Sequence, residues 1–270
     1  MVDMNAADLP YNTKNALLAV SDVVNILAAY GVDAPPKNID IYRKAFVHKS
    51  YCTRKNENFV TGNTKCPVGC LPLQEDSNER LEFLGDAILN VTVATYLFER
   101  YPSENEGFLT RMRTKLVNGK MLAHLSKIVG LEKFILMSKQ IEEGEGRSNT
   151  NILEDTLEAF IAAVQFDLGL ETAREWIINV MEANLDFSDL VKLNNNMKDI
   201  ILKYYQQNFG YTPKFYEIDV TIEGKNKMFK VCLKDINGTI ISDGSGRTKK
   251  EAEQDAAKKA IMTQCPEYLN

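Results

Sequence analysis

Residues 79–90 read Glu-Arg-Leu-Glu-Phe-Leu-Gly-Asp-Ala-Ile-Leu-Asn and predict a largely apolar helix that also carries acids. Glu79, Glu82 and Asp86 follow an i, i+3, i+7 spacing, which places them on one face of an α-helix. Apolar residues fill most of the other positions, so these carboxylates lose hydration unless a cation compensates them. A divalent metal ion is the first candidate for that cation.

A second acidic helix is predicted at residues 151–164, which read Asn-Ile-Leu-Glu-Asp-Thr-Leu-Glu-Ala-Phe-Ile-Ala-Ala-Val. Asp155 and Glu158 are again i, i+3 on an otherwise apolar helix. If the two helices pack together, four acids can form one oxygen-rich cluster: Glu82, Asp86, Asp155 and Glu158. Oxygen ligands suit Mg²⁺, with Mn²⁺ as a substitute, rather than zinc. Such a metal can acidify a bound water and neutralise charge on a phosphoryl group.

A simpler interpretation is that these acids cap helices or pair with Arg80, Arg111 or Arg113, because charged residues mostly lie on solvated faces or in ion pairs. Periodicity alone does not decide between the two interpretations. However, residues 79–90 resemble the signature motif of the ribonuclease III family, and residues 151–164 resemble that family's second acidic motif. Both occur in the family's order and spacing, which favours the metal site.

The resemblance implies a role for each acid. It makes Asp86 and Glu158 the catalytic pair, and it makes all four cluster acids metal ligands. Glu79 matches a further signature acid, which lies beside the ligands or against RNA. Phe83 matches an aromatic residue that family members insert into the partner subunit of a homodimer, although it could instead be an ordinary core residue.

Length and composition indicate two modest intracellular domains. A chain of 270 residues is about twice the size of one typical domain, and 44% hydrophobic residues suffice for real cores. No run approaches the ~18 consecutive apolar residues of a membrane span, and no signal-peptide pattern opens the chain. The 5 cysteines suggest no disulfide framework. We therefore expect a soluble, cytoplasmic protein that does not associate with membranes.

Residues 1–190 are expected to form a mainly α, ribonuclease III-like endonuclease domain. Apolar periodicity predicts helices over about 12–30, 39–48, 108–125 and 171–185, with Trp176 as a core anchor. Pro102, Gly130 and Gly169 are expected to end helices. The polar, glycine-rich residues 140–150 are expected to form a loop before the second acidic helix.

Residues 195–265 are expected to form a small α+β domain of α-β-β-β-α order. The predicted elements are a helix to about Phe209, strands over 214–221, 228–234 and 239–242, and a last helix over 249–262. Asn237-Gly238 is a typical hairpin turn. Two glycines, Gly244 and Gly246, lead into the last helix.

The start of that last helix is suited to phosphate, because Lys249 and Lys250 lie in its first turn, beside the positive end of the helix dipole. The segment could also be an ordinary capped surface helix. Residues 244–257 nevertheless resemble the terminal motif of double-stranded-RNA-binding domains, which read the shape of A-form duplexes. The chain's formal net charge is −5, so local clusters must supply the attraction to RNA.

Two segments of this domain depart from the usual pattern. The positions of the first helix that usually contact the minor groove hold Asp199, Leu202 and Lys203, and the loop between the first two strands lacks the usual Gly-Pro-x-His. Lys203 and two lysines of that loop, Lys225 and Lys227, remain candidates for phosphate contact. Minor-groove contacts are therefore expected to be weaker or arranged differently.

A third departure is an insertion at about residues 52–77. It lies between residues 45–51, Ala-Phe-Val-His-Lys-Ser-Tyr, which resemble the family's Ala-Leu-Thr-His-x-Ser-Tyr segment, and the signature helix. His48, Cys52, Cys66 and Cys70 are numerically a possible zinc set. We do not expect structural zinc there, because the spacing is unusual and His48 matches a family position that needs no metal. Free thiols in an inserted loop are the expected state.

The two resemblances together imply a metal-dependent endoribonuclease that acts as a homodimer on double-stranded RNA. Each subunit would cut one strand by hydrolysis, leaving 5′-phosphate and 3′-hydroxyl ends with short 3′ overhangs. The alternative is a protein that binds and sequesters RNA duplexes without cutting them. That alternative predicts loss of at least one cluster acid, and none is missing.

Overall fold

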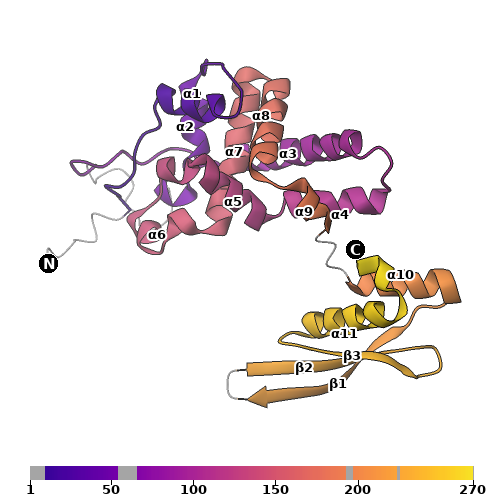
Figure 1. The fold of residues 1–270 in the computed structure, drawn as a ribbon. Helices are drawn as coiled ribbons and strands as arrows, with labels where there is room; N and C mark the ends of the chain where they lie inside the picture. Colours follow the sequence, from indigo (N-terminus) through magenta and orange to yellow (C-terminus); the bar gives the residue numbers. More distant parts are fainter. Residues whose placement is uncertain (1–9, 54–65, 193–196, 224–225, 270) are drawn as a thin grey trace. The chain divides into compact units, whose positions relative to one another are not determined.

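The computed structural model describes residues 10–53, 66–192, 197–223 and 226–269. The chain divides between Phe187 and Ser188 into two compact units, which are described separately below (Figure 1). The unit up to Phe187 is called the helical unit, and the unit from Ser188 is called the α+β unit. The expected fold class is confirmed: a mainly helical unit is followed by an antiparallel sheet with helices.

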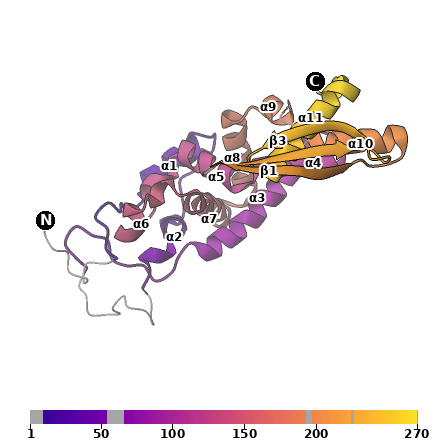
Figure 2. The ribbon, with the colours of Figure 1, turned by 90° about the horizontal axis from the view of Figure 1, so that it is seen from below.

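The helical unit is built around α7 (Thr150–Leu168). This helix contacts α3 (Glu79–Arg100), α5 (Gly119–Val129), α8 (Leu170–Asn184) and α2 (Ile39–Ala45), and Figure 2 shows it end-on among its neighbours. Residues 156–164 of α7 are all buried. A helix that is apolar on nearly every side must be enclosed, which explains why α7 lies at the centre.

Shorter elements complete this unit. The remaining helices are α1 (Val20–Ala28), α4 (Glu106–Leu116) and α6 (Lys139–Glu143), and 3₁₀ turns cover Lys49–Tyr51, Leu131–Phe134 and Gly146–Ser148. The short helix α9 (Phe187–Lys192) begins at the last residue of this unit and otherwise belongs to the α+β unit. Trp176 of α8 is a core anchor, as expected: it is 1% exposed, and its Nε1 donates a hydrogen bond to the carbonyl of Ile26 over 3.3 Å.

Most predicted helix ends are confirmed. α3 stops at Arg100, just before Pro102; α5 ends at Gly130, which adopts φ 81°; and α7 ends before Gly169. The α3 helix is long and apolar enough, by length and composition alone, to cross a membrane. A core helix meets the same criteria, and α3 packs along α7 with three acids in its first half.

The helix predicted to begin at Asn12 is wrong at its start, because α1 begins at Val20. Side-chain amides explain the difference. The Nδ2 groups of Asn12 and Asn15 donate to the carbonyl of Met137 at 3.1 and 3.0 Å, and the N–H of Met137 donates back to Asn15 Oδ1 at 3.1 Å. These long-range bonds hold the segment in a non-helical path across the unit.

Other predicted boundaries also need correction. The helix expected to continue to His48 ends at Ala45. The single helix expected over 108–125 is two helices, because Asn118 starts α5 by accepting a hydrogen bond from the N–H of Met121. Residues 140–150, expected to form a loop, contain most of α6 and a 3₁₀ turn.

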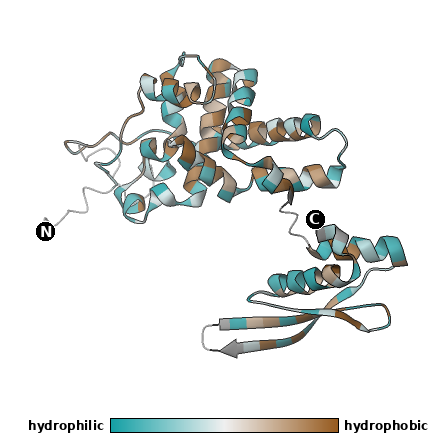
Figure 3. Cartoon of the chain, viewed as in Figure 1, coloured by the Kyte–Doolittle hydropathy of each residue, from teal (hydrophilic) through white to brown (hydrophobic). Residues whose placement is uncertain are grey.

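The α+β unit contains α10 (Met197–Phe209), β1 (Lys214–Glu223), β2 (Asn226–Lys234), β3 (Ile240–Gly246) and α11 (Lys249–Gln264), followed by a 3₁₀ turn (Pro266–Leu269). The strands pair antiparallel in the order β1-β2-β3. α11 packs on β2, β3 and α10 around a core that includes Ile201, Leu233 and Ile261. Figure 3 shows that α11 is largely hydrophilic, whereas α7 of the helical unit carries long apolar stretches.

Candidate metal centre and nucleic-acid surface

Two helices touch through their backbones at the centre of the helical unit. A Cβ atom built on Gly85 of α3 would lie only 1.8 Å from the carbonyl oxygen of Glu158 on α7. No side chain fits in that space, so glycine is required at this position. The contact brings the acidic first half of α3 against the acids of α7.

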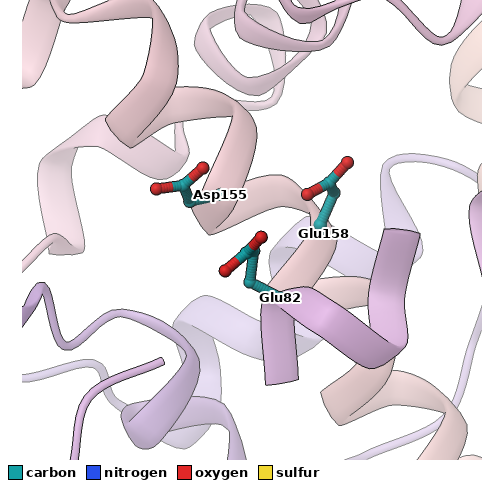
Figure 4. A group of neighbouring side chains, drawn as sticks. All are labelled: Glu82, Asp155 and Glu158. Carbon is teal, nitrogen blue, oxygen red and sulfur yellow. The ribbon is translucent and has the colours of Figure 1, made fainter. Parts of the chain in front are cut away.

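Three carboxylates meet where the two helices touch. Glu82 of α3, together with Asp155 and Glu158 of α7, each place one oxygen within 4.8 Å of the others (Figure 4). Glu158 is only 5% exposed, and Glu82 and Asp155 are partly buried. These three residues are called the acidic trio below.

Asp86 is close to the acidic trio but is not part of it. Its carboxylate is exposed, and Oδ1 accepts a hydrogen bond of 2.6 Å from the Nδ2 group of Asn90, one turn further along α3. Its negative charge still acts on the trio, because it raises the pKa of both Glu158 and Glu82. The structure therefore gathers three of the four predicted ligands and places the fourth beside them.

The pKa values of all three carboxylates of the acidic trio are raised, chiefly by burial. Burial, followed by the charge of Glu82, raises the pKa of Asp155 to about 6. Burial, followed by the charges of Asp86 and then Glu154, raises the pKa of Glu158 to about 8. The pKa of Glu82 is also raised, chiefly by burial. Crowded, partly dehydrated carboxylates of this kind favour a bound cation.

No arginine of the described part of the chain forms an ion pair with the acidic trio. Among the described residues, Glu82, Asp155 and Glu158 make no ion pair, so the alternative in which arginines pair with them is not supported. Glu79 behaves differently: its Oε1 lies 3.2 Å from Lys49 Nζ and its Oε2 accepts from Ser77 Oγ, which lowers its pKa. It therefore lies outside the trio, paired with a lysine.

Sequence reasoning missed two charged residues next to the acidic trio. Lys49, at the start of a 3₁₀ turn, is a positive group whose charge lowers the pKa of Glu82 and Asp155. Glu154 is a further acid on α7, and its pKa is raised by burial and by the charges of Asp86 and Glu82. The i, i+4 spacing of Glu154 and Glu158 was a signal that could have identified Glu154.

Phe83 is not a core residue, because 79% of it is exposed. It projects from α3 beside a hollow whose other apolar lining residues include Ile41, Leu84 and Phe166. Phe166 is itself 62% exposed. Exposed aromatic side chains beside an apolar hollow are typical of an interaction surface.

The lysines predicted to contact RNA are at the surface of the α+β unit. Lys203, Lys227, Lys249 and Lys250 are exposed, while Lys225 lies outside the described residues. Lys249 Nζ is 3.6 Å from Glu217 Oε2 on β1, and both side chains are substantially exposed. Such a surface pair is weak and can exchange for a phosphate.

The start of α11 is organised by a capping box. Thr248 Oγ1 accepts from the N–H of Glu251, and Glu251 Oε2 accepts from the N–H groups of Arg247 and Thr248. These bonds occupy the backbone donors on both sides of the two lysines. The positions left to meet a phosphate are therefore the first helical residues themselves, Lys249 and Lys250.

Part of the predicted insertion, residues 54–65, lies outside the described residues. In the described part, His48 Nδ1 contacts Ser50 Oγ at 2.8 Å, and Cys66 Sγ lies 3.3 Å from the carbonyl oxygen of Cys70. The backbone of Cys52 pairs with the backbone of Gln74 in an isolated parallel β-bridge. The expectation that no structural zinc binds here stays a prediction.

Comparison with known proteins agrees with both units. The family described as Ribonuclease-III-like matches residues 38–184, and the double-stranded RNA binding motif matches residues 197–262. The chain is 33% identical to ribonuclease 3 of a Nitratiruptor species over 221 residues, covering 82% of this chain and 88% of that protein.

Two viral proteins are similar over nearly the whole chain. Protein A464R of Paramecium bursaria Chlorella virus 1 is 36% identical over 261 residues, covering 97% of this chain and 85% of that protein. A protein of Acanthamoeba polyphaga mimivirus named "Probable ribonuclease 3" is 35% identical over 263 residues. That alignment covers 96% of this chain but 47% of the mimivirus protein, so the chain spans about half of that relative. With its two acidic motifs on touching helices and its RNA-binding fold, the chain belongs to the ribonuclease III family of double-stranded-RNA endoribonucleases.

Proposed function

We propose that this chain hydrolyses both strands of double-stranded RNA with the help of Mg²⁺, which Mn²⁺ can replace. The products would carry 5′-phosphate and 3′-hydroxyl ends with short 3′ overhangs, and the reaction would take place in the cytoplasm. The observation that carries the proposal is the acidic trio, in which Glu82, Asp155 and Glu158 lie within 4.8 Å of one another without an ion-pair partner among the described residues.

The donor atoms of this site fit Mg²⁺. They are carboxylate oxygens only, which is the donor set that Mg²⁺ and Mn²⁺ prefer over zinc. Glu82, Asp155 and Glu158 would hold the ion, and Asp86 would join them by turning from Asn90. When bound, the ion would neutralise negative charge on the scissile phosphate and lower the pKa of a coordinated water.

The chain's own residues have distinct roles in this proposal. Glu158 is fixed by its burial and by the Gly85 contact, so its position is set before substrate arrives. Asp86 is exposed on α3 beside the acidic trio, so its carboxylate is accessible to a bound substrate. These two residues form the proposed catalytic pair. Glu79, paired with Lys49, positions that lysine beside the site.

Cutting both strands of a duplex requires two centres, and we propose that a homodimer supplies them. The exposed Phe83 and the hollow beside it on each subunit form a self-complementary pair of the kind that a twofold interface needs. The α+β unit would hold the duplex through Lys249 and Lys250, with Lys203, Lys225 and Lys227 as further phosphate contacts. In this proposal the α+β unit binds the RNA duplex, and the acids of the helical unit cleave it.

Incubation of the full chain with a long RNA duplex, in Mg²⁺ or in EDTA, tests the proposal. Discrete short products are expected only with Mg²⁺, and end-labelling should show 5′-phosphates and 3′ overhangs. A duplex that shifts on a gel but stays intact in both conditions would instead support the sequestering protein.

Glu158→Gln separates the two functions within one chain. Removing this charge should slow cleavage by about 10²–10³-fold, in the range seen when a group that stabilises transition-state charge is lost. The substitution lies in the helical unit, so the dissociation constant for duplex RNA measured by gel shift in EDTA should stay unchanged. Cleavage at the wild-type rate would contradict the role of the acidic trio.

A further inference from the structure

Two cysteines of the insertion are a feature that the proposed function does not use. Three residues separate Cys66 from Cys70, and both are thiols rather than disulfides in the structure. Two thiols this close in a chain can share a metal ion, join in a disulfide or stay independent. The local geometry distinguishes among these three uses.

A tight turn separates the two thiols. The N–H of Cys70 donates a hydrogen bond of 3.1 Å to the carbonyl of Pro67, and Gly69 adopts φ 84°. A hydrogen bond between the first and fourth residues, with a positive φ at the third, is the pattern of a type II β-turn. The chain therefore reverses its direction between Cys66 and Cys70.

The side chain of Cys66 lies across this turn rather than pointing away from it. Its Sγ is 3.3 Å from the carbonyl oxygen of Cys70 and 3.7 Å from the carbonyl oxygen of Pro67. Covalent bond lengths then place this Sγ within about 6 Å of the Cα atom of Cys70. The S–S bond length and the reach of a cysteine side chain require about 4–5 Å for that separation, so rotation of the two side chains can bring the sulfur atoms into bonding range.

Both thiols can meet a reagent from solution. Cys66 is exposed and Cys70 is partly buried, and Cys70 also borders a cavity of about 330 Å³ that α6 helps to line. By contrast, Cys232 and Cys265 of the α+β unit are buried. The exposed Cys66 is therefore the thiol that a small oxidant reaches first, and Cys70 is the neighbour that can displace it.

The turn rests on a base that the fold already holds. The carbonyl of Leu71, next to Cys70, accepts a hydrogen bond of 2.7 Å from the Oη of Tyr51. The N–H of Gln74 donates to the carbonyl of Tyr51 at 3.0 Å, and Leu71 packs against the buried cluster that includes Tyr51. A disulfide across the turn would therefore close a segment whose path is fixed on one side.

Zinc is the competing use of these thiols. Structural zinc takes four ligands, usually cysteine and histidine. In the described part of the chain, no group of three or more possible metal ligands within coordinating distance includes a cysteine. Two neighbouring thiols are too few for such a site, but they are the number that a disulfide needs.

We propose that Cys66 and Cys70 form a reversible disulfide by exchange with a small disulfide such as oxidised glutathione. The Cys66 thiolate attacks one sulfur of the reagent, breaks its S–S bond and releases one glutathione thiolate, which takes up a proton. The Cys70 thiolate then attacks Cys66 Sγ and releases the second glutathione. The two cysteines lose two electrons and two protons, and the reagent becomes two glutathione thiols. This modification site is independent of the proposed metal-dependent function.

Trypsin places both thiols in one peptide, which makes the product simple to identify. Cleavage after Lys65 and Arg80 releases residues 66–80, whereas Cys52 lies in the peptide 50–54. The full chain is incubated with oxidised glutathione, alkylated, digested and analysed by mass spectrometry. The peptide 66–80 should lose two hydrogen atoms and take up no alkylating group, while a pairing with Cys52 would link two peptides.

Single variants separate a completed disulfide from simple thiol reactivity. Cys70→Ser cannot complete the exchange, so glutathione should stay attached to Cys66. Cys52→Ser, the matched control in the same insertion, should form the disulfide as the wild type does. Dithiothreitol should restore both thiols of the wild type.

The melting temperature shows whether the folded turn accommodates the bond. The oxidised wild type should melt about 2–4 °C above the reduced chain, the scale of a modest stabilisation in a chain of this size, and Cys70→Ser should show no such gain. A glutathione adduct that persists on Cys66 of the wild type, a disulfide to Cys52, or a melting temperature that does not rise on oxidation would overturn the proposal.

Discussion

Asp155 and Glu158 are titratable groups whose protonation should couple folding to pH. Without a cation, the folded chain holds a proton on Glu158 up to a pKa of about 8, whereas the unfolded chain releases it near the ordinary value of 4.5. The charges that face this carboxylate are those of Glu82, Asp86, Glu154 and Asp155. A raised folded-state pKa gives stability that is complete below pH 4.5 and is lost as the pH rises through 8.

We therefore expect the melting temperature of the chain in EDTA to fall between about pH 6 and pH 8.5. Mg²⁺ should raise the melting temperature more at about pH 8 than at about pH 6, because at the lower pH protons compete with the ion. Differential scanning fluorimetry across this range measures both effects. Glu158→Gln should flatten the slope in EDTA, and an unchanged slope in that variant would show that another group is responsible.

At the scale of elements, the sequence predicted the helices and strands whose bounds are set by local signals, namely apolar periodicity and turn residues. The lengths of α3 and α7 follow from apolar periodicity and from the stops near Pro102 and Gly169, so both helices were predicted almost to the residue. The α+β unit followed from alternation and the Asn237-Gly238 turn, at which Gly238 adopts φ 84°. Features set by long-range contacts were missed. The start of α1 depends on a carbonyl more than 120 residues away in the sequence.

The site shows the same division between local and long-range information. The spacing of the acids predicted which side chains share a helix face, but it could not show that Asp86 turns to Asn90 or that Lys49 lies beside Glu79. Both contacts depend on side-chain positions that periodicity does not describe. Glu154 was not predicted, although its i, i+4 spacing from Glu158 is present in the sequence, because the resemblance to the family's second acidic motif rests on Asp155 and Glu158.

The segment before α1 gives a prediction at this scale. Asn15 exchanges two hydrogen bonds with the backbone of Met137 and is 9% exposed. Asn15→Ala leaves a buried N–H and a buried carbonyl with fewer partners, which should lower the free energy of unfolding by about 1–3 kcal/mol. Urea denaturation measures the loss. The control is Asn25→Ala, at an exposed position of α1, which should change the free energy of unfolding by less than about 0.5 kcal/mol. Equal losses of stability in the two variants would argue against the anchoring role of Asn15.

For the whole molecule, the exposed Phe83 predicts the oligomeric state. Phe83→Asp places a charge where the proposed interface is apolar, so the mass measured by light scattering after size exclusion should fall from dimer to monomer. Cleavage of both strands should fall with it, while binding of a duplex by the α+β unit should remain. Val68→Asp is the matched control, because Val68 is an equally apolar but fully exposed residue outside that hollow. A Phe83→Asp chain with the wild-type mass would exclude this interface.

Gly85 has a consequence for how the enzyme tolerates mutation. Because the backbones of α3 and α7 touch there, even one added methyl group would have to push the two helices apart and separate Glu82 from Glu158. An unbiased screen for inactive variants should therefore recover substitutions at Gly85 as often as substitutions of the acids. The residue that contributes no functional group would then be as intolerant of replacement as the acids that we propose hold the cation.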